Sequence, residues 1–157
     1  MTINPHLMAP CGLYCGVCAV YKATRDNNIK LKEVLAGVYR GKLPGSENLR
    51  PEQVTCWGCL SGQTWAHCTG CAIRACAQGR GLAGCHQCQD FPCQTIQDFP
   101  MAIAKKVIMR SVPRRAQVGD EAWAAEEEAR YRCLSCGQDL TRGAPRCHHC
   151  GMAVDLD

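Results

Sequence analysis

The pattern of hydrophobic and polar residues predicts a short helix near the N-terminus. Between residues 31 and 39, large apolar side chains recur three or four positions apart, which places them on one face of a helix. These residues are Leu31, Val34, Leu35, Val38 and Tyr39. A helical turn over residues 17–22 precedes this helix, and the Gly-, Pro- and Ser-rich residues 41–51 predict a loop.

A second pair of helices is predicted towards the C-terminus. Residues 101–112 form an amphipathic pattern, with apolar side chains on one arc and basic ones on the other, and Pro113 is expected to end this helix. A further helix should begin at Gly119-Asp120, with Asp120 as the N-cap, and continue to about Tyr131.

No helical or strand periodicity is sustained between residues 56 and 93. This segment holds eight cysteines and six glycines, and we interpret it as loops and turns built around bound metal. Two cysteines separated by two residues can reach one metal ion from a single tight turn, and this spacing recurs along the chain.

The composition indicates that metal replaces part of a hydrophobic core. The chain has 157 residues, 15 of them cysteine, whereas Leu, Ile, Val and Phe together number only 28. So few large apolar residues bury little surface, and the net charge of +4 is too small to indicate a disordered chain. Metal ligation supplies folding free energy where the ligands meet only in the folded state.

Disulfide bonds are the alternative explanation for many cysteines. The first ten residues have neither a basic start nor an apolar centre, so we expect no signal peptide, and no apolar run is long enough to span a membrane. We therefore expect a cytoplasmic protein, in which reduced thiols favour metal over disulfides.

The strongest motif lies at the C-terminus. Cys133-Leu-Ser-Cys136-Gly and Cys147-His-His-Cys150-Gly are two matching turns separated by ten residues, with Leu140 and Ala144 between them. This stretch resembles the short zinc-ribbon family, which implies a small β module with a closed structural zinc site of four thiolates. We expect His148 and His149 to be solvated loop residues.

Most of the chain resembles a cysteine-rich prokaryotic family that is known only as a domain of unknown function. The resemblance rests on CGLYCGVC at residues 11–18, on the cysteine-dense middle segment and on EAWAAEEEARYRC leading into the ribbon. It implies metal binding and transfers no activity.

The eleven other cysteines do not divide into three complete sets of four. The simplest sequential grouping gives two sets of four and a triplet: Cys56, Cys59, Cys68 and Cys71; Cys76, Cys85, Cys88 and Cys93; and Cys11, Cys15 and Cys18. His6, His67 or His86 could complete the triplet, or its fourth position could be open. An arrangement that alternates pairs between ions is equally allowed, because connectivity does not follow from sequence.

The triplet raises the possibility of iron. The C-x3-C-x2-C spacing of Cys11, Cys15 and Cys18 is that of radical-SAM enzymes, which bind a [4Fe-4S] cluster. The chain has no alternating series of strands and helices from which their partial barrel could form, so we exclude that enzyme class. A bare iron–sulfur site at the triplet remains an alternative to zinc.

A basic run provides the case for nucleic-acid binding. Five cations and no acid lie between residues 105 and 115, namely Lys105, Lys106, Arg110, Arg114 and Arg115, and Trp57 and Trp65 could stack on bases. Against this interpretation, residues 120–128 carry five acids, so a solvated helix face is favoured.

Together these patterns predict a small, mainly α and irregular metal-stabilised cysteine-rich domain with a C-terminal zinc ribbon of small β structure. The expected division is residues 1–118 for the cysteine-rich domain, 119–132 for a linking helix and 133–157 for the ribbon. We expect a zinc-binding adaptor with three to four zinc ions, a protein partner and no catalysis of its own. The alternatives are an iron–sulfur redox or sensor protein that uses the triplet, and a nucleic-acid-binding zinc protein.

Overall fold

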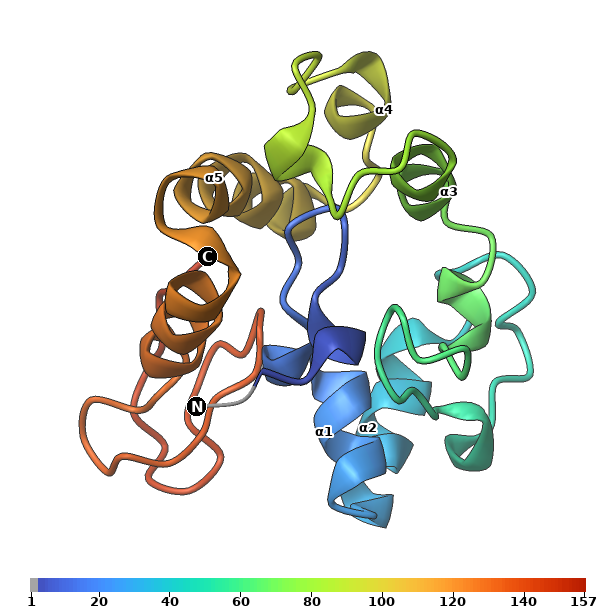
Figure 1. Ribbon diagram of the computed structural model, residues 1–157. Helices are drawn as coiled ribbons and strands as arrows, with labels where there is room; N and C mark the ends of the chain where they lie inside the picture. The colour runs from blue at the N-terminus through green and yellow to red at the C-terminus, as the bar shows by residue number, and fades with distance from the viewer. Residues whose placement is uncertain (1–2) are drawn as a thin grey trace.

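The computed structural model describes residues 3–157, which are mainly helical (Figure 1). The α-helices are α1 (Ala19–Arg25), α2 (Ile29–Tyr39), α3 (Ala72–Gly79), α4 (Gln94–Gln97) and α5 (Ala102–Arg130). Short 3₁₀ helices connect them: η1 (Pro5–Leu7), η2 (Cys15–Val17), η3 (Pro51–Gln53), η4 (Ala66–Cys68) and η5 (Cys85–Gln87). The mainly α and irregular architecture predicted from the sequence is confirmed.

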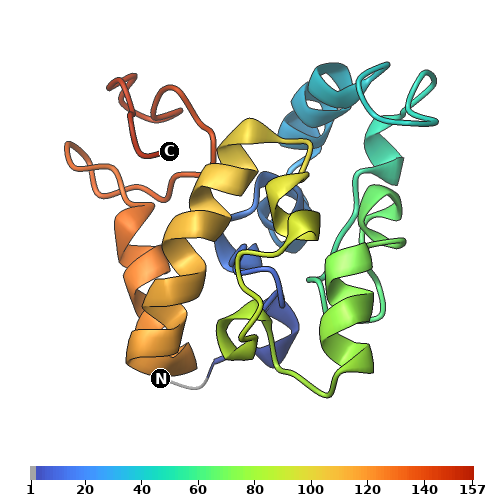
Figure 2. The ribbon, with the colours of Figure 1, turned by 90° about the horizontal axis from the view of Figure 1, so that it is seen from above.

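The N-terminal segment occupies the middle of the molecule. In Figures 1 and 2 it runs between α5 and the C-terminal loops on one side and the segment containing α3 on the other. Backbone bonds fix it there, since the Pro10 carbonyl accepts from the amide of Cys85 at 2.8 Å and the His6 carbonyl from that of Leu60 at 3.1 Å. Cysteines distant in sequence thereby approach the first three.

Three small apolar clusters take the place of one large core. One joins the N-terminal segment to the end of α5 and the C-terminal loops, one surrounds α1 and α2, and one joins the N-terminal segment to α3, α4 and α5. Cysteines contribute to all three. This distribution agrees with the shortage of large apolar residues.

Helix α2 confirms the predicted element and corrects its predicted buried face. Leu35 and Ala36 are buried, with Leu31 and Tyr39 packed beside them, whereas Val34 and Val38 are 60% and 46% exposed. The helix buries residues four apart on one narrow stripe, because it packs mainly against the short helix α1.

Two helices depart from the predictions: α3 lies within residues 56–93, which were interpreted as loops and turns, and α5 continues past Pro113. Pro113 lies inside the helical run instead of ending it. The flanking Ile108, Val112 and Arg115 are buried, and this packing keeps the chain helical at a position that lacks one backbone hydrogen bond. The helical run breaks only at Gly119, where φ is 80° and ψ is 173°, and the second arm starts there, close to the predicted helix start at Gly119-Asp120.

Gly119 divides α5 into two arms that fold back on one another (Figure 2). Arg114 donates to the carboxylate of Glu126 at 2.8 and 2.5 Å, and Arg110 to that of Glu127 at 2.5 and 3.2 Å. The arginines of the basic run therefore pair with acids of the second arm, whereas Lys105 donates to the carbonyl of Gln97. The sequence alone had suggested a solvated face for these cations.

The expected β structure of the C-terminal module is not formed as strands. Within the described residues 133–157 and their junction with α5, β pairing consists of two isolated bridges, Arg132 with Asp139 and Arg146 with Ala153. Each bridge lies at the base of one cysteine turn, and the turns are too short to extend the pairing. No helix in the described part of the chain has the length and apolar character needed to cross a membrane.

Candidate metal centre

Four cysteines of the C-terminal module converge on one point. We call Cys133, Cys136, Cys147 and Cys150 the C-terminal quartet; their Sγ atoms all lie within 4.8 Å of one another. The Sγ atoms of Cys133 and Cys150 are 3.6 Å apart, and those of Cys136 and Cys147 are 3.7 Å apart. Zinc–sulfur bonds of about 2.3 Å in a tetrahedron place sulfurs about 3.8 Å apart, so the quartet has the dimensions of a four-thiolate site.

The backbone forms the two halves of the quartet in the same way. The amide of Gly137 donates to the Cys133 carbonyl at 2.8 Å, and that of Gly151 to the Cys147 carbonyl at 2.9 Å. The two glycines have φ values of 71° and 72°, which side chains with a Cβ rarely adopt. The glycine after each pair of cysteines, which the sequence singles out, therefore has a conformational role.

Backbone amides prepare the second half of the quartet for metal. The amides of Cys150 and His149 face the sulfur of Cys147 and lower its pKa, and the amide of Met152 lowers the pKa of Cys150. A lower pKa favours the thiolate, which is the form that binds metal.

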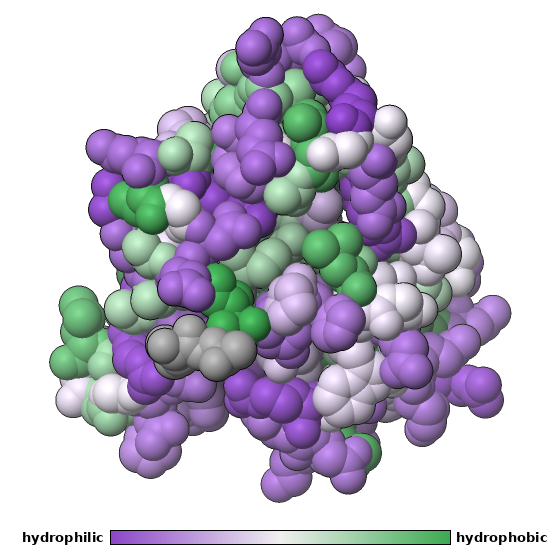
Figure 3. Space-filling model, in the orientation of Figure 1, coloured by the Kyte–Doolittle hydropathy of each residue, from purple (hydrophilic) through white to green (hydrophobic). Residues whose placement is uncertain are grey.

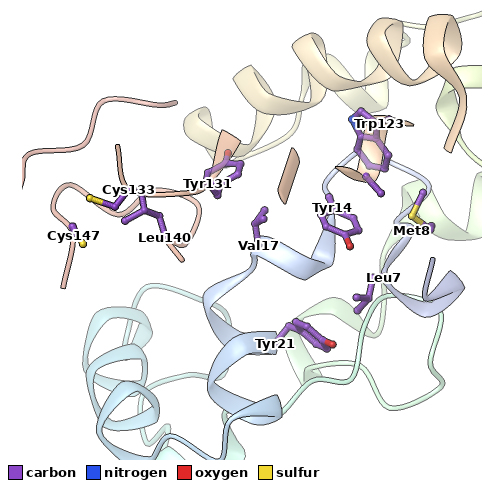
Figure 4. Close-up of a cluster of buried hydrophobic side chains, with 11 residues drawn as sticks. Leu7, Met8, Tyr14, Val17, Tyr21, Trp123, Tyr131, Cys133, Leu140 and Cys147 are labelled. Atoms are coloured by element: carbon purple, nitrogen blue, oxygen red, sulfur yellow. The ribbon is translucent and has the colours of Figure 1, made fainter. Parts of the chain in front are cut away.

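The quartet is anchored to the N-terminal part of the chain. Cys133 and Cys147 are buried in the apolar cluster that also holds Val17, Leu140 and Tyr131 (Figure 4). Polar contacts of Lys22 and Arg142 add to this packing.

Two cations hold the C-terminal module in place. Lys22 is buried and donates to the carbonyl of Leu140 at 2.9 Å, and Arg142 donates to the carbonyl of Tyr14 at 2.8 Å. The amide of Arg142 also donates to the Val17 carbonyl at 3.0 Å. The module is therefore tied to the segment that carries the N-terminal triplet.

A second set of cysteines lines one small cavity. We call Cys76, Cys85, Cys88 and Cys93 the cavity quartet; they surround a space of about 40 Å³ together with Ile73 and Ile96. Burial, together with the neighbouring thiols of Cys88, Cys93 and Cys76, raises the pKa of Cys85 to about 11. The sequential grouping expected from the spacing thus corresponds to residues that share a cavity.

The seven remaining cysteines form a further group of neighbours. Burial raises the pKa of Cys68 to about 12, with further contributions from four neighbouring thiols, namely Cys18, Cys56, Cys59 and Cys71. Burial likewise raises the pKa of Cys11 to about 12, with Cys59 and Cys71 as neighbouring thiols. The N-terminal triplet therefore does not stand apart from the set at residues 56–71, as the sequential grouping had placed it.

The C-terminal quartet is more compact than the other cysteine groups of the described chain. Among residues 3–157, only the C-terminal quartet brings three or more potential ligand atoms of His, Cys, Asp or Glu within 4.8 Å of one another. The sulfurs of the other eleven cysteines are neighbours, but they are not gathered as closely.

The histidines considered as ligands have other contacts. The ring of His6 is 2.9 Å from the carbonyl of Leu60, His67 packs edge-on against Trp65, and His86 lies 3.7 Å from the carboxylate of Asp120. His148 and His149 are exposed, as expected of loop residues.

Two arginines beside cysteine sulfurs were missed by sequence reasoning. Arg74 lies 3.7 Å from the Sγ of Cys59, and Arg80 lies 3.2 Å from the Sγ of Cys88. Arg74 lies in α3, and Arg80 is the C-cap of this helix. The sequence signal that could have indicated them is the presence of arginines between paired cysteines. Cations at these positions stabilise nearby thiolates.

Comparison with known proteins identifies one match. A family model described as "Protein of unknown function (DUF3795)" matches residues 7–98, which include all eleven cysteines outside the C-terminal quartet. No curated protein and no solved structure matches the chain.

Proposed function

The chain belongs to the DUF3795 family of proteins of unknown function, and we propose its function from its cysteine sites: it is a metal-binding interaction module without catalysis of its own. In this proposal the C-terminal quartet holds one structural zinc ion in a zinc ribbon. The eleven cysteines of the family region supply thiolates to further metal sites.

The geometry of the C-terminal quartet carries this proposal. Its two Sγ–Sγ distances of 3.6 and 3.7 Å match a tetrahedral zinc site. Four thiolates would complete the coordination of the ion and leave no open position for a substrate or a water nucleophile. A site of this kind supports folding, and catalysis is not expected from it.

The thin apolar clusters support a stabilising role for metal. Cys133 and Cys147 are 4% and 2% exposed and form part of the cluster that joins the two ends of the chain. Zinc bound by these residues would convert binding free energy into folding free energy, since the four ligands come together only in the folded module.

A protein partner is more consistent with the surface than a nucleic acid. Three of the five cations in the basic run have carboxylate partners within the molecule, namely Arg110, Arg114 and Arg115. Those pairs neutralise the positive charge that phosphate binding requires. Polar residues cover much of the face in Figure 3, with apolar patches among them, and α2 leaves Val34 and Val38 exposed.

Elemental analysis of purified variants tests the zinc site. We expect Cys136→Ser to lower the zinc content of the full chain by about one ion per molecule, because three thiolates bind zinc more weakly than four. The double variant His148→Ala/His149→Ala is the matched control within the same turn and should keep the zinc of the wild-type protein. Equal zinc content in Cys136→Ser and wild type would contradict the proposed site.

A further inference from the structure

The cavity quartet differs from the C-terminal quartet in a way that bears on what it binds. In the described chain, no three sulfurs of Cys76, Cys85, Cys88 and Cys93 lie within 4.8 Å of one another. Two thiolates on the same ion, each about 2.3 Å from it, lie at most about 4.6 Å apart. As placed, the cavity quartet is too open for three of its sulfurs to share one ion.

The four cysteines nevertheless face a common space. All four line the same cavity of about 40 Å³, and they come from three separate segments: α3, the turn around η5 and the residue before α4. The Cys85 thiol interacts electrostatically with each of the other three. Four thiols that face one space without gathering within reach of one ion are compatible with a cluster in which each sulfur binds a different metal atom.

The lining of the cavity fits an iron–sulfur cluster. Ile73, Ala77, Leu82 and Ile96 make most of the remaining wall apolar. An apolar wall limits the access of water, and solvent exposure is one of the factors that set the reduction potential of a cluster. Among residues 3–157, no histidine or carboxylate is part of the cavity lining, and the carboxylate of Asp90 lies 4.0 Å from the Sγ of Cys88 at its edge.

A cation stands at the edge of the cavity. Nη1 of Arg80 lies 3.2 Å from the Sγ of Cys88 and 2.9 Å from the carboxylate of Asp90. An arginine that donates to a ligand sulfur offsets part of the negative charge of a cluster with four thiolates and raises its reduction potential. Arg80 therefore contacts both the ligand sulfur of Cys88 and the carboxylate of Asp90.

We infer that Cys76, Cys85, Cys88 and Cys93 bind a [4Fe-4S] cluster, with one thiolate on each iron. This inference rests on the proposed role of the family-region cysteines as metal ligands and identifies the occupant of one site. It places iron–sulfur chemistry at the cavity quartet instead of at Cys11, Cys15 and Cys18, where the sequence spacing had suggested it.

Anaerobic reconstitution of the full chain with ferrous iron and sulfide tests the inference. We expect a brown protein with about four irons and four sulfides per chain and absorbance near ~400 nm. Cys85→Ser/Cys88→Ser should lose this iron, and Cys11→Ser/Cys15→Ser/Cys18→Ser should retain it. A colourless wild-type protein, or iron that is lost with the triplet but kept without Cys85 and Cys88, would overturn the inference.

A second measurement does not depend on removing ligands. Dithionite supplies one electron that converts [4Fe-4S]²⁺ to [4Fe-4S]⁺, so the charge of the cluster with its four thiolates changes from −2 to −3. Arg80→Ala should shift this potential to a more negative value, because the reduced state loses a neighbouring cation. Arg74→Ala is the matched control on the same helix, beside Cys59, and should leave the potential unchanged.

The two proposals fail separately in these experiments. Zinc that depends on Cys136 reports on the C-terminal quartet, whereas iron that depends on Cys85 and Cys88 reports on the cavity quartet. Equal shifts of the potential in the Arg80 and Arg74 variants would place the cluster elsewhere and overturn the inference even where every variant folds.

Discussion

The carboxylate of Glu127 is 2% exposed and accepts hydrogen bonds from both terminal nitrogens of Arg110, at 2.5 and 3.2 Å. The two residues lie on opposite arms of α5, 17 positions apart. The pair therefore joins the arms of the helical hairpin that supports the N-terminal segment. It also uses a cation that the sequence had offered as a contact for nucleic acid.

Removing Arg110 should destabilise the protein more than removing its neighbour Arg114. Arg110→Ala leaves the buried carboxylate of Glu127 without its ionic partner, and breaking a pair in this way costs about 3 kcal/mol of unfolding free energy. Arg114 pairs with Glu126 at the surface, where water screens the two charges, so Arg114→Ala should cost much less. Urea unfolding followed by circular dichroism measures both values, and equal costs would contradict the assigned roles.

The turn between the arms of α5 depends on Gly119. A Cβ at this position would meet no atom within 4 Å, so space does not exclude alanine. The backbone conformation disfavours alanine, because φ of 80° with ψ of 173° is a conformation that almost only glycine adopts. Gly119→Ala should therefore reduce the unfolding free energy by about 1–3 kcal/mol.

Gly37 offers the matched control for this substitution. It lies within α2, and a Cβ there would also meet no atom within 4 Å. Because alanine favours helix over glycine, Gly37→Ala should raise the unfolding free energy by about 0.5–1 kcal/mol. Thermal unfolding of both variants decides the point: a change of the same sign in the two would show that the backbone at Gly119 is not the cause.

The sequence predicted the elements that depend on local patterns. The helix around Leu35 follows from periodicity, and the start of a helical arm at Gly119-Asp120 from the expected N-cap, and both elements are present. Pro113 shows where local reasoning failed, since packing of residues on either side keeps the helix intact. The return of the second arm onto the first depends on contacts 12 to 17 residues apart, which periodicity does not encode.

The cysteine sites also divide into those that local spacing predicts and those that depend on long-range contacts. The spacing at the C-terminus indicated the quartet that the structure gathers within 4.8 Å. The grouping of the other eleven depends on the path of the N-terminal segment through the molecule, and this path brings Cys11 beside Cys59 and Cys71. Spacing along the chain does not contain that information. For the same reason, the contact of Arg80 with Cys88 could not be predicted from the sequence.

The internal pairing of the basic run leads to a prediction about nucleic acid. We expect the wild-type protein to show no salt-dependent affinity for single-stranded DNA between 50 and 200 mM salt, because three of the five cations of the basic run are paired with carboxylates and do not displace counterions. Fluorescence anisotropy with a labelled oligonucleotide measures this. Glu126→Gln releases Arg114 from its ion pair and should produce weak binding that salt removes, whereas strong binding by the wild type would favour the nucleic-acid alternative.

Removal of metal from the C-terminal quartet should loosen the module that carries it. Cys133 and Cys147 pack in the same cluster as Val17 and Tyr131, so loss of the ion should weaken the packing between the C-terminal module and the N-terminal segment. Trypsin reports the change, because Arg132, Arg142 and Arg146 all lie in or beside the module. We expect cleavage at these arginines to become at least about tenfold faster after chelation, as opening of a metal-stabilised segment exposes its backbone.

Cleavage elsewhere in the chain provides the control for that measurement. Lys30 lies at the start of α2, whose packing does not involve the C-terminal module, so cleavage there should be unaffected in Cys136→Ser. In that variant the three C-terminal sites should already be cleaved fast without chelator. If the chelator accelerates cleavage at Lys30 and at Arg142 equally, metal supports the whole fold and the C-terminal quartet has no local role. If neither rate changes after zinc is shown to have left, packing of Leu140 against the N-terminal segment holds the module without the ion.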